Sequence, residues 1–241
     1  MPLPLPTADR LNEVASGRQI EFLSAGPFSH VVIDDLFERD ALLDLVEAFP
    51  GADGVRWDLF HPAGNAGQKL VLSTESKIPA LLRELIQFFH SALWIEFLWN
   101  LTGMAGLIVD PDLSGCGLHS TGPGGYVKIH SDSSRHPNRD LDQRLNLILY
   151  LNPWWREEWG GHLELWDRLA SKCERMILPD LGRLVLFDTG TTCFHGHPYP
   201  LSCPPERRRN SVAIYYYVAA RGIDRDHAGW RESPDFRPEV A

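Results

Sequence analysis

The sequence has few cysteines and no long uninterrupted hydrophobic run, and each absence excludes a class of protein. Its 241 residues contain four cysteines, none of them in a CxxC pair, so a zinc ribbon is excluded and a disulfide scaffold is not expected. We interpret the thiols as reduced, which predicts a cytoplasmic protein. The most apolar stretch, residues 85–109, contains Gln87, His90, Glu96 and Asn100, and a bilayer would not tolerate these side chains without partners. We therefore expect no membrane-spanning segment.

The sequence also lacks a secretory signal and an acidic tail. Residues 1–10 carry three prolines and no order of basic then apolar residues, which argues against a signal peptide. The net charge of -9 is spread along the chain and argues against a nucleic-acid backbone as partner. We expect a protein that acts neither on nucleic acid nor at a membrane, and the sequence sets no oligomeric state.

The first hundred residues are predicted to be mainly helical. Apolar residues at helical spacing follow Asp40 and stop at Pro50. A second helix is predicted to begin at Pro79, whose fixed φ suits a first helical position. A third is predicted over 92–102, with Gly103 as its left-handed cap. We expect these helices to cover one side of a sheet.

From residue 107 onward the pattern changes to short strands separated by turn residues. Six are predicted, at 125–130, 144–151, 161–166, 183–187, 191–195 and 210–218. Their number and spacing predict an antiparallel sandwich or jelly roll within a single domain. The polar stretch 131–143 is the one long insertion between strands, and it is interpreted as either a mobile lid or a surface excursion.

Two residues at the end of a predicted strand have the spacing of metal ligands. His130 and Asp132 are two apart, so their side chains point to the same face. His195, on a later strand, can supply a third ligand. Two histidines and one carboxylate are the ligand set of non-haem iron(II) oxygenases, because three protein ligands leave positions open for cosubstrate and dioxygen. The HxD pattern is common by chance, so a hydrogen-bonded surface pair remains the alternative at this point.

An arginine on the last predicted strand has the parity of an inward-facing residue. Arg209 and Ser211 are two apart, and Tyr215 continues the same face into an apolar run. A guanidinium facing into a barrel must be paired there, and a dicarboxylate bound through a two-pronged contact is a natural counter-ion. The alternative is a solvated basic run with Arg207 and Arg208, but only Arg209 has the parity of Ser211.

Five blocks follow one another through the second half of the chain. They are GGYVKIHSD at 124–132, RLNLILYLNP at 144–153, WGGHLELW at 159–166, FHGHP at 194–198 and RNSVAIYYY at 209–217. Together they resemble the prolyl 4-hydroxylase-like branch of the iron(II) and 2-oxoglutarate-dependent oxygenases, and VVIDDLF at 31–37 resembles that family's opening strand. The resemblance implies an α+β fold, with a double-stranded β-helix (jelly roll) core and N-terminal helices packed against the sheet. We predict one oxygenase domain over 1–241, with a mainly helical part at 1–105, the jelly-roll core at 106–220 and a C-terminal extension at 221–241.

The resemblance also implies the roles of five residues. His130, Asp132 and His195 match the iron ligands of the family. Arg209 with Ser211 matches the anchor for the far carboxylate of 2-oxoglutarate. In related halogenases a small residue replaces the carboxylate ligand, so Asp132 favours hydroxylation.

Further residues are expected around the cosubstrate. Tyr150 matches a tyrosine that reaches the same carboxylate, and Leu163 matches a pocket wall. Asn146 shares strand parity with Tyr150 and is expected to face the pocket or to act as a structural amide. His197 competes with His195 for the metal by parity, but the family writes this block as His-Gly-x-Pro, which selects His195.

Candidates for substrate contact are Tyr126, Lys128 and His197. Tyr126 and Lys128 share the parity of His130, with packing or solvent exposure as the alternative. Three other histidines have no informative spacing and are expected at the surface or in the core: His119, His136 and His162.

The implied function is hydroxylation of an unactivated C–H bond, with release of succinate and CO2. The implied cofactors are iron(II), 2-oxoglutarate and dioxygen, with ascorbate as a candidate reductant. The expected substrate is a prolyl or other amino-acid-derived group, and the first alternative is a natural-product tailoring oxygenase that acts on a small molecule. A jelly-roll zinc hydrolase would give Arg209 no role, and a non-catalytic ligand-binding sandwich would leave the intact triad unexplained.

Overall fold

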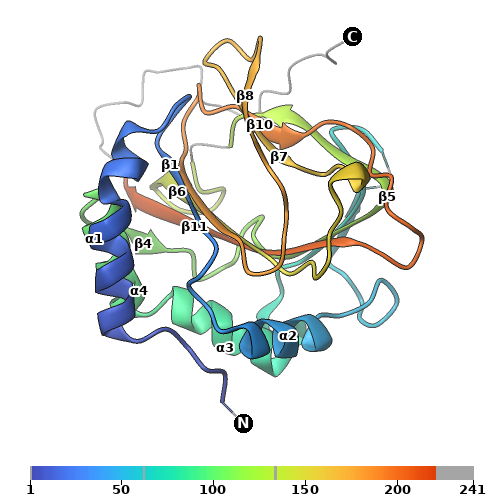
Figure 1. Cartoon of the computed structure of the whole chain (residues 1–241), viewed down its shortest axis with the longest axis horizontal. Coiled ribbons are helices and arrows are strands. Elements are labelled where there is room, and N and C mark those ends of the chain that lie inside the picture. The colour runs from blue at the N-terminus through green and yellow to red at the C-terminus, as the bar shows by residue number, and fades with distance from the viewer. Residues whose placement is uncertain (1, 62, 133–134, 221–241) are drawn as a thin grey trace.

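The computed structural model describes residues 2–61, 63–132 and 135–220 (Figure 1). Among them are the helices α1 (Ala8–Ser24), α2 (Arg39–Ala48), α3 (Ala80–Phe89) and α4 (Ala92–Thr102), and two short 3-10 helices, η1 (Glu75–Lys77) and η2 (Glu157–Trp159). The three helices predicted from the sequence correspond to α2, α3 and α4. The predicted C-terminal extension at 221–241 lies outside the described residues, and the division of the chain into three parts stays a prediction.

The strands form one antiparallel sheet that rolls up on itself. They are β1 (His30–Ile33), β2 (Leu59–His61), β3 (Ala66–Leu72), β4 (Ile108–Val109), β5 (Gly117–His130), β6 (Leu141–Tyr150), β7 (Leu163–Trp166), β8 (Cys173–Ile177), β9 (Leu184–Asp188), β10 (His195–His197) and β11 (Arg209–Ala219). Their order is β1-β9-β6-β11-β5-β10-β7-β8, while β3 also pairs with β5, β2 with β3, and β4 with β11. The long strand β5 pairs with β11 through its first half and with β10 through its second half. The predicted jelly-roll core in an α+β fold is confirmed.

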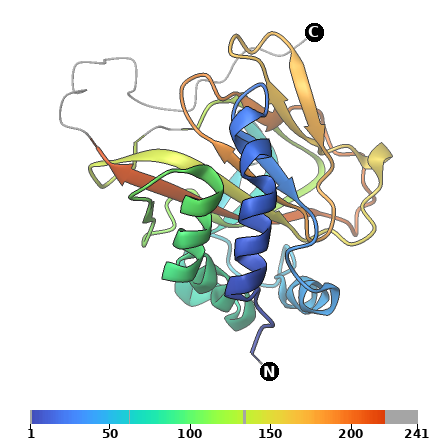
Figure 2. The ribbon, with the colours of Figure 1, turned by 60° about the vertical axis from the view of Figure 1, so that its left-hand side comes forward.

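The two faces of the sheet carry different sets of side chains. On β6, Leu145, Leu147 and Leu149 belong to the large core that includes the helices, whereas Asn146 and Tyr150 have the opposite parity and point into the roll. Helices α1 and α4 pack side by side against the outside of the sheet, and α2 and α3 lie at its end (Figures 1 and 2). The inside of the roll holds polar side chains and a second, smaller apolar cluster of Tyr150, Leu163, Leu165, Ile177, Val185 and Phe187.

Two parts of the first hundred residues differ from the sequence expectation. Helix α1 begins after Thr7, whose side chain caps it. Its buried residues Leu11, Val14, Ala15 and Phe22 lie on one face, but Ile20 and Leu23 are apolar and exposed, so the apolar period in the sequence is weak. Strands β2 and β3 were not expected. In β3 the register with β5 shifts between Gly67 and Lys69, and such a bulge removes the alternation that identifies a strand.

Residues 135–143 of the polar stretch are held in place by a buried pair of side chains, His136 and Asp110. The Nε2 atom of His136 lies 3.1 Å from Oδ1 of Asp110, and both side chains are fully buried. Asp110 also accepts backbone N–H groups of its own turn, and Asp112 is paired with Arg139 through both of its oxygens. These acidic groups are already used by protein donors, and they anchor the segment that enters β6.

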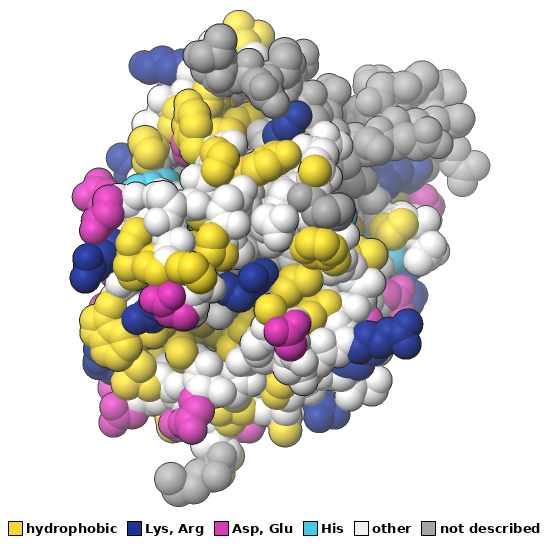
Figure 3. All heavy atoms as spheres, turned by 90° about the vertical axis from the view of Figure 1, so that its right-hand side faces the viewer, with side chains coloured by type: hydrophobic (Ala, Val, Ile, Leu, Met, Phe, Trp, Pro, Cys, Tyr) yellow, Lys and Arg dark blue, Asp and Glu magenta, His cyan; other side chains and the backbone are white. Residues whose placement is uncertain are grey.

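Two observations agree with the composition. Within the described part of the chain, no helix is both long and apolar enough to cross a bilayer. On the face shown in Figure 3, hydrophobic side chains lie between charged side chains of both signs, as a charge spread along the chain predicts.

Candidate active site

A cavity opens inside the rolled sheet, where β5, β6, β10 and β11 meet. The space between its walls is about 530 Å³, including its open mouth. Many of the residues singled out from the sequence line it: His130, Asp132, Asn146, Leu163, His195, His197, Arg209 and Ser211. The fold thus brings together side chains that are up to 81 positions apart.

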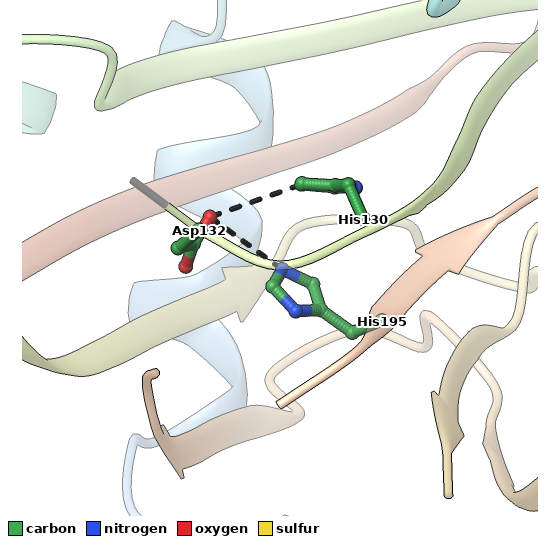
Figure 4. A group of neighbouring side chains, drawn as sticks. All are labelled: His130, Asp132 and His195. Carbon is green, nitrogen blue, oxygen red and sulfur yellow. Dashed lines mark ion pairs between the residues drawn. The ribbon is translucent and has the colours of Figure 1, made fainter. Parts of the chain in front are cut away.

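Three of these side chains converge on one point (Figure 4). Oδ1 of Asp132 lies 3.8 Å from Nε2 of His130 and 3.7 Å from Nε2 of His195. Two ligand atoms bound at about 2.1 Å to one ion cannot be more than about 4.2 Å apart, and both distances satisfy that limit. The geometry fits a metal ion held by two histidines and one carboxylate.

The backbone turns both imidazoles toward that point. Nδ1 of His130 lies 2.8 Å from the carbonyl oxygen of Lys128, and Nδ1 of His195 lies 3.1 Å from that of Cys193. A carbonyl oxygen only accepts, so Nδ1 carries the hydrogen and Nε2 presents its lone pair. Burial, with His195 adding to it, lowers the pKa of His130 to about 4. His130 is therefore neutral near pH 7, as a metal ligand must be.

The carboxylate is fixed from its other side. Oδ2 of Asp132 accepts a 2.9 Å hydrogen bond from Nδ2 of Asn146 and a 3.1 Å bond from Nε2 of Gln143. Both donors bind the same oxygen, so Oδ1 is the atom that faces the two histidines. Asn146 was a candidate for the pocket because of its strand parity. Gln143 was missed because it lies one residue before the predicted start of its strand, at residue 144.

A β-bulge lies next to the triad. His195 is opposite His130 and His197 is opposite Val127, so two steps on β10 correspond to three on β5. One extra residue on a strand reverses the parity of the residues beyond it. Accordingly, Val127 and His130 both line the cavity, and so do His195 and His197.

The bulge changes the position of two substrate candidates. The Tyr126 ring lies against Gly67, where a Cβ atom would come within 2.6 Å of it, and its hydroxyl donates to the carbonyl of Gly64. Neither Tyr126 nor Lys128 is among the residues that line the cavity. The parity argument that placed them on the face of His130 is therefore wrong for this strand, and their contact with substrate stays a prediction.

Arg209 is buried at the other end of the cavity, with 7% of its surface exposed. Its Nε donates to the carbonyl of Gly161 at 2.7 Å, and one terminal nitrogen donates to the hydroxyl of Tyr150 at 3.0 Å. Tyr150 also lies under the guanidinium, 4.8 Å from ring centre to Cζ. Among the described residues Arg209 forms no ion pair with a carboxylate. A buried cation without a counter-charge is costly, so this guanidinium suits a bound carboxylate.

The sequence reasoning missed several cavity residues, among them Lys69, His119 and Thr121. Lys69 on β3 lies opposite Thr121 on β5, and His119 lies opposite Ser211. Burial, with Arg209 adding to it, lowers the pKa of Lys69 to about 8. Burial also holds the pKa of His119 well below its usual value. No pattern signal identified Lys69, since its strand was not predicted, and β5 begins eight residues before its predicted start.

Part of the chain matches the model of a known protein family. Residues 116–217 match the model of the 2OG-Fe(II) oxygenase superfamily. The matched segment runs from just before β5 into β11, and therefore contains the triad and Arg209. No curated protein matches the chain in sequence.

Solved structures share the fold. A prolyl 4-hydroxylase from Phytophthora capsici is 23% identical, with a TM-score of 0.58; the match covers 88% of this chain and 66% of that one. A prolyl hydroxylase from Trichoplax adhaerens, in complex with a hypoxia-inducible-factor peptide fragment, is 18% identical, covers 87% and 91%, and has a TM-score of 0.56. HygX from Streptomyces hygroscopicus, with nickel, 2-oxoglutarate and hygromycin B bound, is 11% identical, covers 89% and 94%, and has a TM-score of 0.53.

At these identities the similarity to solved structures establishes the fold, which is the double-stranded β-helix that the resemblance implied. The donor set fits the metal of this family, because two histidines and a carboxylate suit iron(II). Residues 116–217 match the 2OG-Fe(II) oxygenase superfamily, and this match supports the expectation from the sequence resemblance of a dioxygenase that uses iron(II) and 2-oxoglutarate.

Proposed function

We propose that this protein hydroxylates an unactivated C–H bond of a prolyl or other amino-acid-derived substrate. Substrate, dioxygen and 2-oxoglutarate are consumed, and the hydroxylated substrate, succinate and CO2 are released. The observation that carries the proposal is the convergence of the triad on one point of a cavity that also holds a buried arginine, which has no carboxylate partner in the described part of the chain. When bound, iron(II) and 2-oxoglutarate supply the oxidising chemistry.

The protein contributes position and charge. His130, Asp132 and His195 would hold the metal through Nε2, Oδ1 and Nε2. The other polar atom of each side chain, Nδ1 or Oδ2, is held by a hydrogen bond within the protein. Arg209, oriented by the carbonyl before β7 and by a tyrosine hydroxyl, would bind the far carboxylate of 2-oxoglutarate, with Ser211 beside it. Apolar walls along β6 and β7 keep water from this end of the cavity.

Two kinds of substrate are compatible with the fold. The Trichoplax adhaerens relative was solved with a peptide fragment, and HygX was solved with hygromycin B. A cytoplasmic location fits the four cysteines, which are all free. A zinc hydrolase remains the less favoured candidate, because it would leave the buried guanidinium of Arg209 without a ligand.

The proposed function predicts how the site loads. Anaerobic addition of iron(II) and 2-oxoglutarate to metal-free protein is expected to produce the visible charge-transfer band of the chelate. His195→Ala removes a direct ligand, so iron affinity should fall by more than the roughly 10–100-fold expected for an outer-shell partner. Arg209→Ala should weaken 2-oxoglutarate binding by about 30-fold or more, since it removes a buried charged partner, while iron affinity changes little.

His197→Ala is the matched control for the ligand assignment, because His197 lies on the same strand and lines the same cavity. This variant should keep its iron. If His197→Ala abolishes iron binding and His195→Ala does not, the assignment is wrong. Absence of the band in the parent protein would favour the hydrolase instead.

A further inference from the structure

A second cation, Lys69, faces the same cavity as Arg209, and the proposed function gives it no role. Lys69 lies opposite Thr121 of β5, and Thr121 lies opposite Arg209 of β11. Residues opposite each other on neighbouring strands project from the same face, and all three line the cavity. The two cations therefore flank one threonine from its two sides.

The charge of Lys69 has no counterpart in the loaded cavity. Among the described residues that line it, Asp132 is the only carboxylate. Iron(II) and 2-oxoglutarate carry opposite charges of two, and Asp132 balances Arg209, so Lys69 is left as one uncompensated positive charge. No hydrogen bond or ion pair within the described part of the chain involves its ammonium group. A buried cation in this position calls for a further anion.

That anion is distinct from the far carboxylate of 2-oxoglutarate. The guanidinium of Arg209 is turned toward β6 and β7, where it contacts Tyr150 and the carbonyl of Gly161. Lys69 comes from β3, which pairs with the opposite edge of β5. A carboxylate held by Arg209 thus leaves Lys69 available to a second bound molecule.

The imidazole of His197 lies in the same cavity as Lys69 and has no hydrogen-bond partner among the described residues. Both ring nitrogens of His197 are buried and form no hydrogen bond to any described residue, and His197 lines the cavity within electrostatic reach of Lys69. A buried polar side chain is normally satisfied by a partner. One anionic molecule with hydrogen-bonding groups would satisfy both residues.

We propose that Lys69, with His197 in the same cavity, binds the carboxylate of the primary substrate. The substrate is then a small molecule with a free carboxylate, such as a free amino acid, and not an internal prolyl residue of a polypeptide. The inference rests on the proposed function and narrows its substrate class. Lys69 would act as a substrate-binding residue, because it contacts the substrate and not the reacting atoms.

The test compares a carboxylate with its neutral analogue. The full chain is loaded with nickel, which replaces iron without turnover, and with 2-oxoglutarate. Binding of each free proteinogenic amino acid, its carboxamide and, for proline, the capped peptide acetyl-Gly-Pro-Gly-amide is then measured by calorimetry. At least one free amino acid should bind about tenfold or more tightly than its carboxamide, as loss of one buried charged contact predicts, and the capped peptide should not bind.

Variants assign the difference to Lys69. Lys69→Met should abolish the preference for the carboxylate while 2-oxoglutarate affinity stays within about twofold, and Lys69→Arg should retain the preference because it retains the charge. Lys172→Met is the matched control, since Lys172 is an exposed lysine in the turn before β8, and it should behave as the parent. The parent comparison alone tests the proposal if Lys69→Met does not fold.

Three results would overturn the proposal. The first is that no free amino acid binds the loaded parent, or that each binds no better than its carboxamide. The second is that the capped peptide binds as well as free proline. The third is that Lys69→Met lowers 2-oxoglutarate affinity about tenfold, which would make Lys69 an anchor of the cosubstrate. Failure of the parent to bind 2-oxoglutarate at all would instead refute the proposed function.

Discussion

At the scale of single residues, the position of one carboxylate oxygen depends on two amides. Asn146 and Gln143 both donate to Oδ2 of Asp132, which leaves Oδ1 to face the two histidines. Asn146→Ala removes the shorter of these hydrogen bonds and frees the carboxylate to rotate. We expect metal affinity to fall by about 10–100-fold, the usual cost of losing a partner of a metal ligand. Titration of metal-free protein with nickel measures this change.

The control must separate positioning from general loss of structure. Asn12→Ala alters an exposed asparagine on α1 and should leave metal affinity unchanged. The thermal midpoint of metal-free Asn146→Ala should fall far less than its metal affinity does. Equal metal affinity in Asn146→Ala and the parent would show that Asp132 is fixed by other contacts.

At the scale of elements, the pairing of β10 with β5 sets the distance between the two histidines. Gly196 separates His195 from His197, and a Cβ atom there would lie 2.8 Å from the backbone carbonyl oxygens of both Val127 and Lys128. Backbone atoms cannot move aside as side chains can, so Gly196→Ala should push β10 away from β5. We expect overpacking to cost about 1–3 kcal/mol of stability, and metal affinity to fall, because His195 moves away from His130.

Gly190→Ala is the matched control, because it adds the same methyl group just before β10. The nearest atom to a Cβ there is the sulfur of Cys193 at 3.9 Å, an ordinary contact distance. Metal affinity should therefore stay at the parent value in Gly190→Ala. Unchanged metal binding in Gly196→Ala would mean that β10 can shift without moving the imidazole of His195.

Strand parity explains which parts of the site could be predicted from the sequence. On β11 the alternation is regular, and Arg209 and Ser211 share the cavity as their spacing indicates. On β5 the bulge reverses the alternation, and Tyr126 and Lys128, which precede His130 on this strand, are not among the residues that line the cavity. A bulge has no signature in one sequence, because it depends on the register of the partner strand. The same limit applies to Lys69, which lies beside a second register shift.

At the scale of the whole molecule, folding lowers the pKa of several histidines by burying their imidazole rings. Burial is the largest cause of a lowered pKa at seven of them: His30, His61, His90, His119, His130, His162 and His197. Their unfolded pKa is near 6.5, so below that pH the unfolded chain binds more protons than the folded one. Stability must then fall with falling pH in this range. Burial raises the pKa of the carboxyl groups of Glu164 and Asp188, which acts in the opposite direction.

Seven histidines outweigh two carboxyl groups, so metal-free protein should unfold at lower denaturant concentration at pH 5.5 than at pH 7.5. Guanidinium unfolding in the presence of a chelator measures this, since bound metal would compete with protons at His130. His90 lies outside the cavity, and its buried Nε2 has no partner among the described residues. Because one proton changes the slope by about 1.4 kcal/mol per pH unit, His90→Leu should make the dependence shallower by up to that amount. A midpoint that is constant or rises on acidification would show that the buried carboxyl groups dominate, and that the histidines are hydrated in the folded protein.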